Sequence, residues 1–303
     1  MRRFVKGLLR RLPPSTADAL LERARTYQDK RYFKQGFAQV KCGNYLLDCP
    51  KHHPLLMFQR SQPYRDRSVS IVAELAGKKY PDGTIIDIGA NIGDTAALIA
   101  TYARNKLILV EASDYFFEIL TRNVASFPND VELRKAMVSD GSYSSGSLHH
   151  RGGTAYFQEG PHGHGSVKTE RLVDIADAKT CFIKIDTDGY DAQILADSLE
   201  WLAANRPLVL FENWIRNAKD LSIADSLYDD LIKIGYEYFI VWDDPGFHIV
   251  STTSSDVLKD LNRYLYKLSQ QGPPGSIGNF DVLCAQPIDQ DIYIDVSKWY
   301  RAN

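Results

Sequence analysis

The chain has 303 residues, of which 44% are hydrophobic, and its formal net charge is −2. This length and composition suit one large α/β domain with additional segments, or two small domains. The small net charge gives no reason to expect a polyanionic partner, and the basic residues gather in an N-terminal segment while the rest of the chain is acidic. We therefore expect no specific nucleic-acid partner.

Residues 1–36 are predicted to form a basic helical extension. On a helix, Phe4, Val5 and Leu8 share one face, and arginine and lysine side chains lie elsewhere. A helix of this kind can contact an anionic membrane surface through residues 1–12, or dock on a partner protein or on the body of the chain, and the sequence leaves these alternatives open.

The sequence predicts a cytoplasmic protein, with the inner face of the membrane as an alternative location. No run of apolar residues is long enough to span a bilayer, and the first residues do not resemble a signal peptide. Cys181 and Cys284 lie in apolar runs and are expected to be buried thiols, and none of the four cysteines forms a Cys-x-x-Cys pair.

Residues 37–80 are predicted to form a hairpin and a helix that pack on the core. Gly43-Asn44 is a typical hairpin turn pair within residues 37–48, and residues 65–78 have a helical pattern. From residue 81 to residue 285, strands and helices alternate, which predicts a Rossmann-like, doubly wound parallel sheet with helices on both faces. The expected strands are 84–88, 106–111, 131–138, 180–185, 207–211, 236–242 and 280–285, and the expected helices are 91–104, 115–127, 190–204, 223–234 and 254–271. A second hairpin is expected within residues 147–158, and residues 286–303 are predicted to be a C-terminal tail.

Polar and acidic residues follow four of the predicted strands. They are Asp87, Gly89, Asn91 and Gly93 after the first strand, Glu111 after the second, Asp186 after the fourth, and Glu212, Asn213 and Trp214 after the fifth. Ligands of open α/β sheets bind beyond the carboxyl ends of the strands, so these residues predict a binding site at one edge of the sheet.

The first turn, residues 87–94, favours a cationic nucleotide ligand. A dinucleotide site requires the pattern G-x-G-x-x-G, and Asn91 stands where its middle glycine would let the backbone approach a pyrophosphate. Acidic residues nearby suit S-adenosyl-L-methionine, which carries a sulfonium and an amine and no phosphate. Glu111 follows Asp87 at about the spacing, ~20 residues, at which an acidic group binds ribose hydroxyls. A nicotinamide-dependent oxidoreductase is the enzyme alternative.

The runs Ile85–Gly93 and Ile183–Tyr190 resemble the two hallmark motifs of FkbM-type methyltransferases, the second being usually written K-I-D-x-E-G-x-E. Asp188 and Asp191 replace its glutamates, and Glu111-Ala112-Ser113-Asp114 departs from the family's Glu-Pro-x-Pro. The resemblance, which covers about residues 37–285, implies a class I methyltransferase fold, S-adenosyl-L-methionine as donor and a hydroxyl acceptor. The residues expected to bind the donor are Asp87, Gly89, Ala90, Asn91, Gly93, Asp94, Glu111, Ala112, Ser139 and Asp186.

Three kinds of residue are candidates for the chemistry of methyl transfer. Asp186 is expected to orient or deprotonate the acceptor, with anchoring of the loop or of the donor's amine as the alternative. His162 and His164, in a glycine-rich loop, are candidate bases or solvent-exposed loop residues. Trp214, Trp242 and Tyr190 could stack on a sugar ring or pack the rim of the site.

A magnesium site is also predicted as an alternative. Asp186, Glu212 and Asn213 are similar to the Asp and Asp-Asn ligands of catechol-type O-methyltransferases, and oxygen ligands suit Mg²⁺. The other interpretation is a hydrogen-bonding cradle without a metal.

The sequence thus predicts an O-methyltransferase whose acceptor is a sugar hydroxyl in a polysaccharide or glycolipid. The alternatives are methylation of a secondary-metabolite hydroxyl and a non-catalytic, methyltransferase-like module in a glycan-assembly complex. Residues 141–170 and 243–279 are expected to shape the acceptor pocket.

Overall fold

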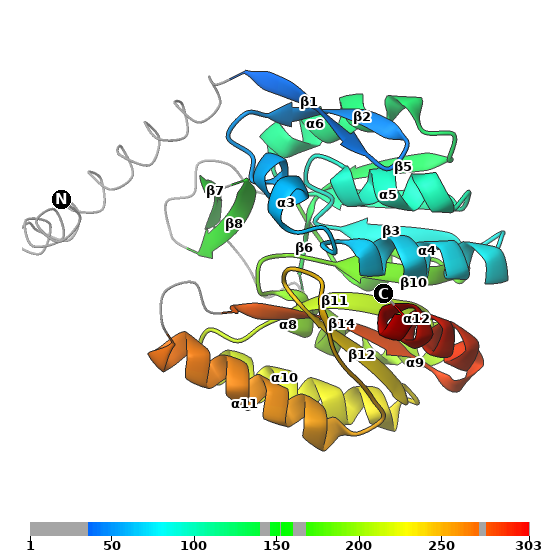
Figure 1. Cartoon of the computed structure of the whole chain (residues 1–303), viewed down its shortest axis with the longest axis vertical. Coiled ribbons are helices and arrows are strands. Elements are labelled where there is room, and N and C mark those ends of the chain that lie inside the picture. Colours follow the sequence, from blue (N-terminus) through cyan, green and yellow to red (C-terminus); the bar gives the residue numbers. More distant parts are fainter. Residues whose placement is uncertain (1–35, 140–145, 152, 160–167, 273–276, 303) are drawn as a thin grey trace, which may run out of the picture.

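A computed structural model describes residues 36–139, 146–151, 153–159, 168–272 and 277–302 (Figure 1). The predicted basic helical extension and its proposed contact residues 1–12 lie outside this part of the chain. Within it, a central eight-stranded sheet has helices on both faces, so the predicted doubly wound α/β fold class is confirmed.

The sheet has the strand order β13-β12-β14-β11-β10-β3-β4-β5. Its strands are β3 (Thr84–Ile88), β4 (Lys106–Glu111), β5 (Val131–Lys135), β10 (Thr180–Ile185), β11 (Leu208–Trp214), β12 (Tyr238–Asp243), β13 (His248–Thr252) and β14 (Asn279–Ala285). The expectation of a parallel sheet is wrong in one respect, because β14 runs antiparallel between β11 and β12, and β13 runs antiparallel to β12 at the edge.

Alternate residues of the sheet contribute to two separate hydrophobic cores. One face packs against α4 (Arg67–Lys79), α5 (Asp94–Tyr102), α6 (Asp114–Asn123), α12 (Gln290–Ala302) and the hairpin of β1 (Phe37–Cys42) and β2 (Tyr45–Pro50). The other face packs against α7 (Leu172–Ile175), α8 (Asp191–Asp197), α9 (Leu199–Asn205), α10 (Ala218–Lys233) and α11 (Ser255–Gln271). Ile85 and Ile86 illustrate the alternation, since they are both fully buried but belong to different cores.

The described chain ends in a helix rather than in the predicted tail. A single turn of 3₁₀ helix, η2 (Pro287–Asp289), leads into α12, which packs against β12 and α4 and buries Ile292 and Val296. The edge strand β13 and the short helix α3 (Leu55–Ser61) were also not predicted.

Other boundaries differ for local reasons. The side chain of Asn217 accepts hydrogen bonds from two backbone N–H groups, so α10 begins at residue 218 and not at 223. The predicted helix 190–204 divides at Ser198, whose hydroxyl donates to the carbonyl of Ile194. A single turn of 3₁₀ helix, η1 (Val124–Ser126), extends α6. The predicted strand 131–138 leaves the sheet after residue 135, and β6 (Met137–Val138) pairs with β9 (Thr169–Glu170).

Both predicted hairpins are confirmed, at β1–β2 and at β7 (Gly146–Arg151) with β8 (Thr154–Glu159). In Figure 1 the second of these stands outside the main sheet, beside α3. All four cysteines are buried and form no disulfide. No helix among the described residues is both long and apolar enough to cross a membrane.

We expect Asn123→Ala to lower the free energy of unfolding by about 3 kcal/mol, because it leaves buried backbone groups without partners. The side-chain amide of Asn123 donates to the carbonyls of Asp48 and Ile92 and accepts from the N–H of Asp48, and so joins the β1–β2 hairpin to the first turn of the sheet. Denaturant unfolding measures the change. The control Asn205→Ala, which removes one hydrogen bond to Trp201 at the end of α9, should cost less than about 1 kcal/mol.

Candidate functional site

A cavity of about 360 Å³ lies at the carboxyl ends of β3, β4, β10 and β11. This is the edge of the sheet at which the sequence predicts a ligand, and the volume is within the range of small-molecule sites. The residues of its wall come from the strand ends, the α3–α4 segment, the β7–β8 hairpin and the loop after β12.

The turn after β3 forms the floor of the cavity. Gly89 has a φ of +79°, and a Cβ atom there would lie 1.8 Å from the carbonyl oxygen of Asp186, so only glycine fits. Asn91 takes a left-handed φ of +49°. Its side-chain oxygen lies 3.3 Å from Nε2 of His53, and its amide donates to the carbonyl of Gly153 at 2.8 Å. The residues His53 and Gly153, which belong to two other segments of the chain, therefore hold this turn in place.

Asp87 lies beneath the floor and does not line the cavity. Its side chain is fully buried, accepts a hydrogen bond from the hydroxyl of Thr95 at 2.5 Å, and lies 3.1 Å from Nζ of Lys184. The same ammonium lies 3.4 Å from Asp186, whose side chain is 48% exposed in the cavity. Asp87 thus acts on the site by holding Thr95 and Lys184.

Glu111, at the end of β4, is held in one orientation. One carboxylate oxygen accepts from the N–H of Asn91 at 2.9 Å, and the other accepts from the N–H of Ser113 at 2.7 Å. Burial raises the pKa of Glu111 to about 7, although these two hydrogen bonds oppose the shift.

The β7–β8 hairpin is attached to three parts of the cavity wall. His150 Nε2 lies 2.7 Å from the hydroxyl of Ser113, Gly153 accepts from Asn91, and the hydroxyl of Thr154 donates to Asp188. Of residues 141–170, which were expected to shape an acceptor pocket, Leu148, Gly153, Thr154 and Ala155 line this cavity.

The opposite end is closed by the segment between α3 and α4. The guanidinium of Arg65 forms two contacts of 2.9 Å with the carboxylate of Asp244, which follows β12, and stacks 4.0 Å from the ring centre of Phe58. Asp66 lines the same end, and burial together with Asp94 raises its pKa to about 6.

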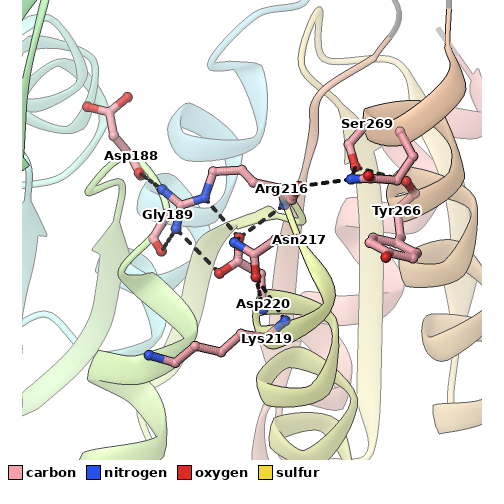
Figure 2. Close-up of polar contacts among 9 residues, drawn as sticks. Asp188, Gly189, Arg216, Asn217, Lys219, Asp220, Tyr266 and Ser269 are labelled. Carbon is pink, nitrogen blue, oxygen red and sulfur yellow. Dashed lines mark hydrogen bonds and ion pairs between the residues drawn. The ribbon is translucent and has the colours of Figure 1, made fainter. Parts of the chain in front are cut away.

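Arg216 binds the backbone of the second sequence motif, at Asp188 and Gly189 (Figure 2). Its guanidinium donates to the carbonyls of Asp188 and Gly189 at 3.3 and 3.0 Å and is paired with Asp220 at 2.9 Å. Asp188 and Gly189 have φ values of +54° and +99°, and these contacts hold that unusual backbone in place. The side chains of Asp188 and Tyr190 then line the cavity.

Glu212 lies two residues before the end of β11, and one oxygen of its carboxyl group has no hydrogen-bond partner among the described residues. Its Oε1 accepts a hydrogen bond from the side chain of Asn279, and its Oε2 is buried without a hydrogen-bond partner among the described residues. Burial and the carboxylates of Asp186, Asp191 and Asp188 raise the pKa of Glu212 well above its usual range.

Carboxylates dominate the charge of the wall. They belong to Asp66, Asp94, Glu111, Asp186, Asp188, Glu212 and Asp244. The cations of the wall are Lys184 and Arg65, each already paired with aspartate, while burial lowers the pKa of His53 to about 4. Such a cavity disfavours phosphate and favours a cationic or neutral polar ligand.

The predicted magnesium triad does not assemble. Because β11 continues to Trp214, Glu212 and Asn213 point to opposite faces of the sheet. The amide of Asn213 donates to Tyr228 and Asn262, in the core on the α10 and α11 side. Among the described residues, no group of three or more His, Cys, Asp or Glu side chains is placed to hold a metal ion.

The predicted donor-binding residues divide into two groups. Gly89, Asn91, Asp94, Glu111, Ala112 and Asp186 line the cavity, whereas Asp87, Ala90, Gly93 and Ser139 do not. The candidate bases His162 and His164 lie outside the described residues. Of the three candidate aromatic residues, Tyr190 and Trp214 line the cavity, and Trp242 is fully buried in the core against Tyr300.

Several wall residues were not predicted, namely His53, Arg65, Asp66, Asp244 and Asn279. The first three precede the sheet in sequence and stand in no recognisable motif. Asp244 and Asn279 belong to residues 243–279, which were expected to shape an acceptor pocket.

No model of a known protein family and no curated protein matches the chain. Solved structures with a loosely similar fold include TYW2 from M. jannaschii in complex with AdoMet, with 12% identity, a TM-score of 0.42, and coverage of 83% of this chain and 86% of that one. Precorrin-6y C5,15-methyltransferase from Geobacter metallireducens GS-15 has 11% identity, a TM-score of 0.36 and coverage of 71% and 86%. Methyltransferase FkbM from Methylobacillus flagellatus KT has 14% identity, a TM-score of 0.36, and coverage of 67% of this chain and 43% of that one.

We expect Asp188→Asn to raise the free energy of unfolding by about 1–3 kcal/mol at about pH 7.5 and to change it little at about pH 4. Burial and Asp186 raise the pKa of Asp188 to about 6, so the folded protein loses stability as the pH rises from the unfolded pKa, about 4, through 6 and this carboxyl group ionises. Asparagine keeps an oxygen for the hydroxyl of Thr154 and removes the charge. Denaturant unfolding at the two pH values measures the effect.

The control Asp197→Asn removes an aspartate from the exposed end of α8. It should give the same small change at both pH values. An equal effect of Asp188→Asn at the two pH values would show that the charge of Asp188 does not lower the free energy of unfolding.

Proposed function

We propose that the protein is an S-adenosyl-L-methionine-dependent O-methyltransferase acting on a sugar hydroxyl of a polysaccharide or glycolipid. The observation that carries the proposal is a carboxylate-lined cavity at the carboxyl ends of the central strands, where two backbone hydrogen bonds hold Glu111 at the end of β4. A nicotinamide dinucleotide would bring its pyrophosphate against Asp94 and Asp186, which argues against the oxidoreductase alternative.

The donor fits along the strand ends. Its ribose hydroxyls would donate to Glu111, and the adenine ring would lie against the apolar wall formed by Val110, Met137 and Val138. Gly89 lines the cavity between Glu111 and Asp186, so the chain of the donor would cross the end of β3 toward β10, where Asp186 can receive its amine.

The other end of the cavity suits a neutral, hydroxyl-rich acceptor. Trp214, Tyr190 and Phe58 contribute aromatic rings to the wall, each with an arginine over one face. The nearby carboxylates can accept hydrogen bonds from hydroxyl groups. A sugar ring has both an apolar face and a rim of hydroxyl donors, so it matches this combination better than an anionic acceptor does.

Methyl transfer is an in-line displacement, and alignment contributes much of the rate. The bond from sulfur to the methyl carbon breaks with its electron pair staying on sulfur, the acceptor oxygen bonds to the carbon, and the hydroxyl proton passes to a carboxylate. Asp186 is ion-paired with Lys184, which suits it to orienting the acceptor or the donor's amine. No metal is required for these steps.

The purified protein should bind S-adenosylhomocysteine at micromolar concentrations, and Glu111→Ala should weaken that binding about tenfold or more through loss of a charge-assisted hydrogen bond. Calorimetry measures both affinities. Glu118→Ala removes an exposed glutamate of α6 and should leave the affinity unchanged. Thermal unfolding of each variant verifies that it is folded, and wild-type protein that binds no S-adenosylhomocysteine would contradict the proposal.

The acceptor class is tested in the organism that carries the gene. Mass spectrometry of its polysaccharides and glycolipids, with and without the gene, should reveal the loss of one methyl ether, and restoring the gene with the Glu111→Ala substitution should not bring it back. Unchanged glycans together with normal donor binding would direct the search to secondary-metabolite hydroxyls.

A further inference from the structure

Glu212 is the wall residue whose charge is least compensated. Its backbone N–H donates to Asp191 at 3.3 Å and its Oε1 accepts from Asn279, but its buried Oε2 receives no hydrogen bond from the described residues. When the carboxyl group is ionised, a buried oxygen in this state is costly unless a ligand supplies the missing positive charge or donor.

Acidic groups approach Glu212 from the neighbouring elements. Asp186 and Asp188 lie in the loop after β10, Asp191 begins α8, and Asp281 lies on β14, and each raises the pKa of Glu212. The nearby cations already have other partners. Lys184 is paired with Asp87 and Asp186, and Arg65 is paired with Asp244. Arg216 is paired with Asp220 and donates to two backbone carbonyls. Nothing in this wall neutralises the ionised form of Glu212.

The strand order indicates where the sulfonium of the donor lies. Glu111 ends β4, Gly89 and Asp186 directly follow β3 and β10, and Glu212 lies two residues before the end of β11. These four strands are consecutive in the sheet, at spacings of about 4.8 Å. A donor held by its ribose at Glu111 and by its amine at Asp186 places its sulfonium between them, over the turn at Gly89. The methyl group, which must face the acceptor end, then points toward β11 and Glu212.

Resting on the proposed function, we propose that Glu212 is a specificity-determining residue that selects the sulfonium-bearing donor over its neutral product. Sulfur carries a positive charge in S-adenosylmethionine and none in S-adenosylhomocysteine, and the two ligands share all other charges. The ionised carboxylate of Glu212 attracts the donor and loses this attraction once the methyl group has left. The site thereby releases its product more readily than it releases its donor.

The test compares the two ligands by calorimetry on the full chain. We expect wild-type protein to bind S-adenosylmethionine about fivefold or more tightly than S-adenosylhomocysteine at the upper end of the pH range in which the protein stays folded. Glu212→Gln keeps an oxygen for Asn279 and removes the charge, so it should abolish most of this preference while its affinity for S-adenosylhomocysteine stays within about twofold. Binding of the neutral ligand also verifies that the variant is folded.

Glu237→Gln is the matched control, because Glu237 is exposed and precedes β12 at the opposite edge of the sheet. It should retain the wild-type preference. The proposal is overturned if wild-type protein binds both ligands equally, or if Glu212→Gln keeps the preference of the wild type.

A second measurement needs no variant, in case Glu212→Gln does not fold. Because burial and the surrounding acids disfavour ionisation of Glu212, the wild-type preference for S-adenosylmethionine should increase with rising pH as its carboxyl group loses its proton, measured across the whole pH range in which the protein stays folded. An equal preference throughout that range would contradict the role of Glu212. Absence of binding by both ligands would instead contradict the proposed donor.

Discussion

A buried ion pair between Lys184 and Asp87 joins the two sequence motifs. The residues are register partners on the neighbouring strands β10 and β3, and Nζ of Lys184 lies 3.1 Å from the carboxylate of Asp87. Asp87 also accepts a hydrogen bond from Thr95 at the start of α5, and Lys184 also pairs with Asp186 in the cavity. This ion pair therefore connects the first turn, the helix α5 and the acidic wall. Removal of either partner would leave an uncompensated charge inside the sheet, which is far more costly than loss of a surface pair.

The fold was largely predictable because its strands are short, apolar and regularly spaced. The bounds of β3, β4 and β10 match the prediction, since each is a run of buried residues between clear breaks. The direction of β14 was not predictable, because a buried strand has the same apolar pattern whichever way it runs. The helix α12 was missed because Ile292, Ile294 and Val296 alternate with period two, which is typical of a strand and not of a helix.

The site was predictable where its residues follow strands and unpredictable where they come from loops. Glu111, Asn91 and Asp186 were found from their positions after β4, β3 and β10, whereas Asp66 and Asp244 depend on how two distant loops meet across the cavity. Glu212 and Asn213 do not form the predicted metal site, because β11 continues past both residues. In a strand, successive side chains point to opposite faces of the sheet.

The insertion of β14 between β11 and β12 has a consequence for the order of folding. This strand follows all the others in the chain, yet β12 and β13 join the rest of the sheet only through it. Its first residue, Asn279, also supplies the hydrogen bond to Glu212. During synthesis, the part of the cavity at the ends of β3, β4 and β10 can therefore assemble before β14 has emerged, whereas the wall at Glu212 is completed only by this last strand.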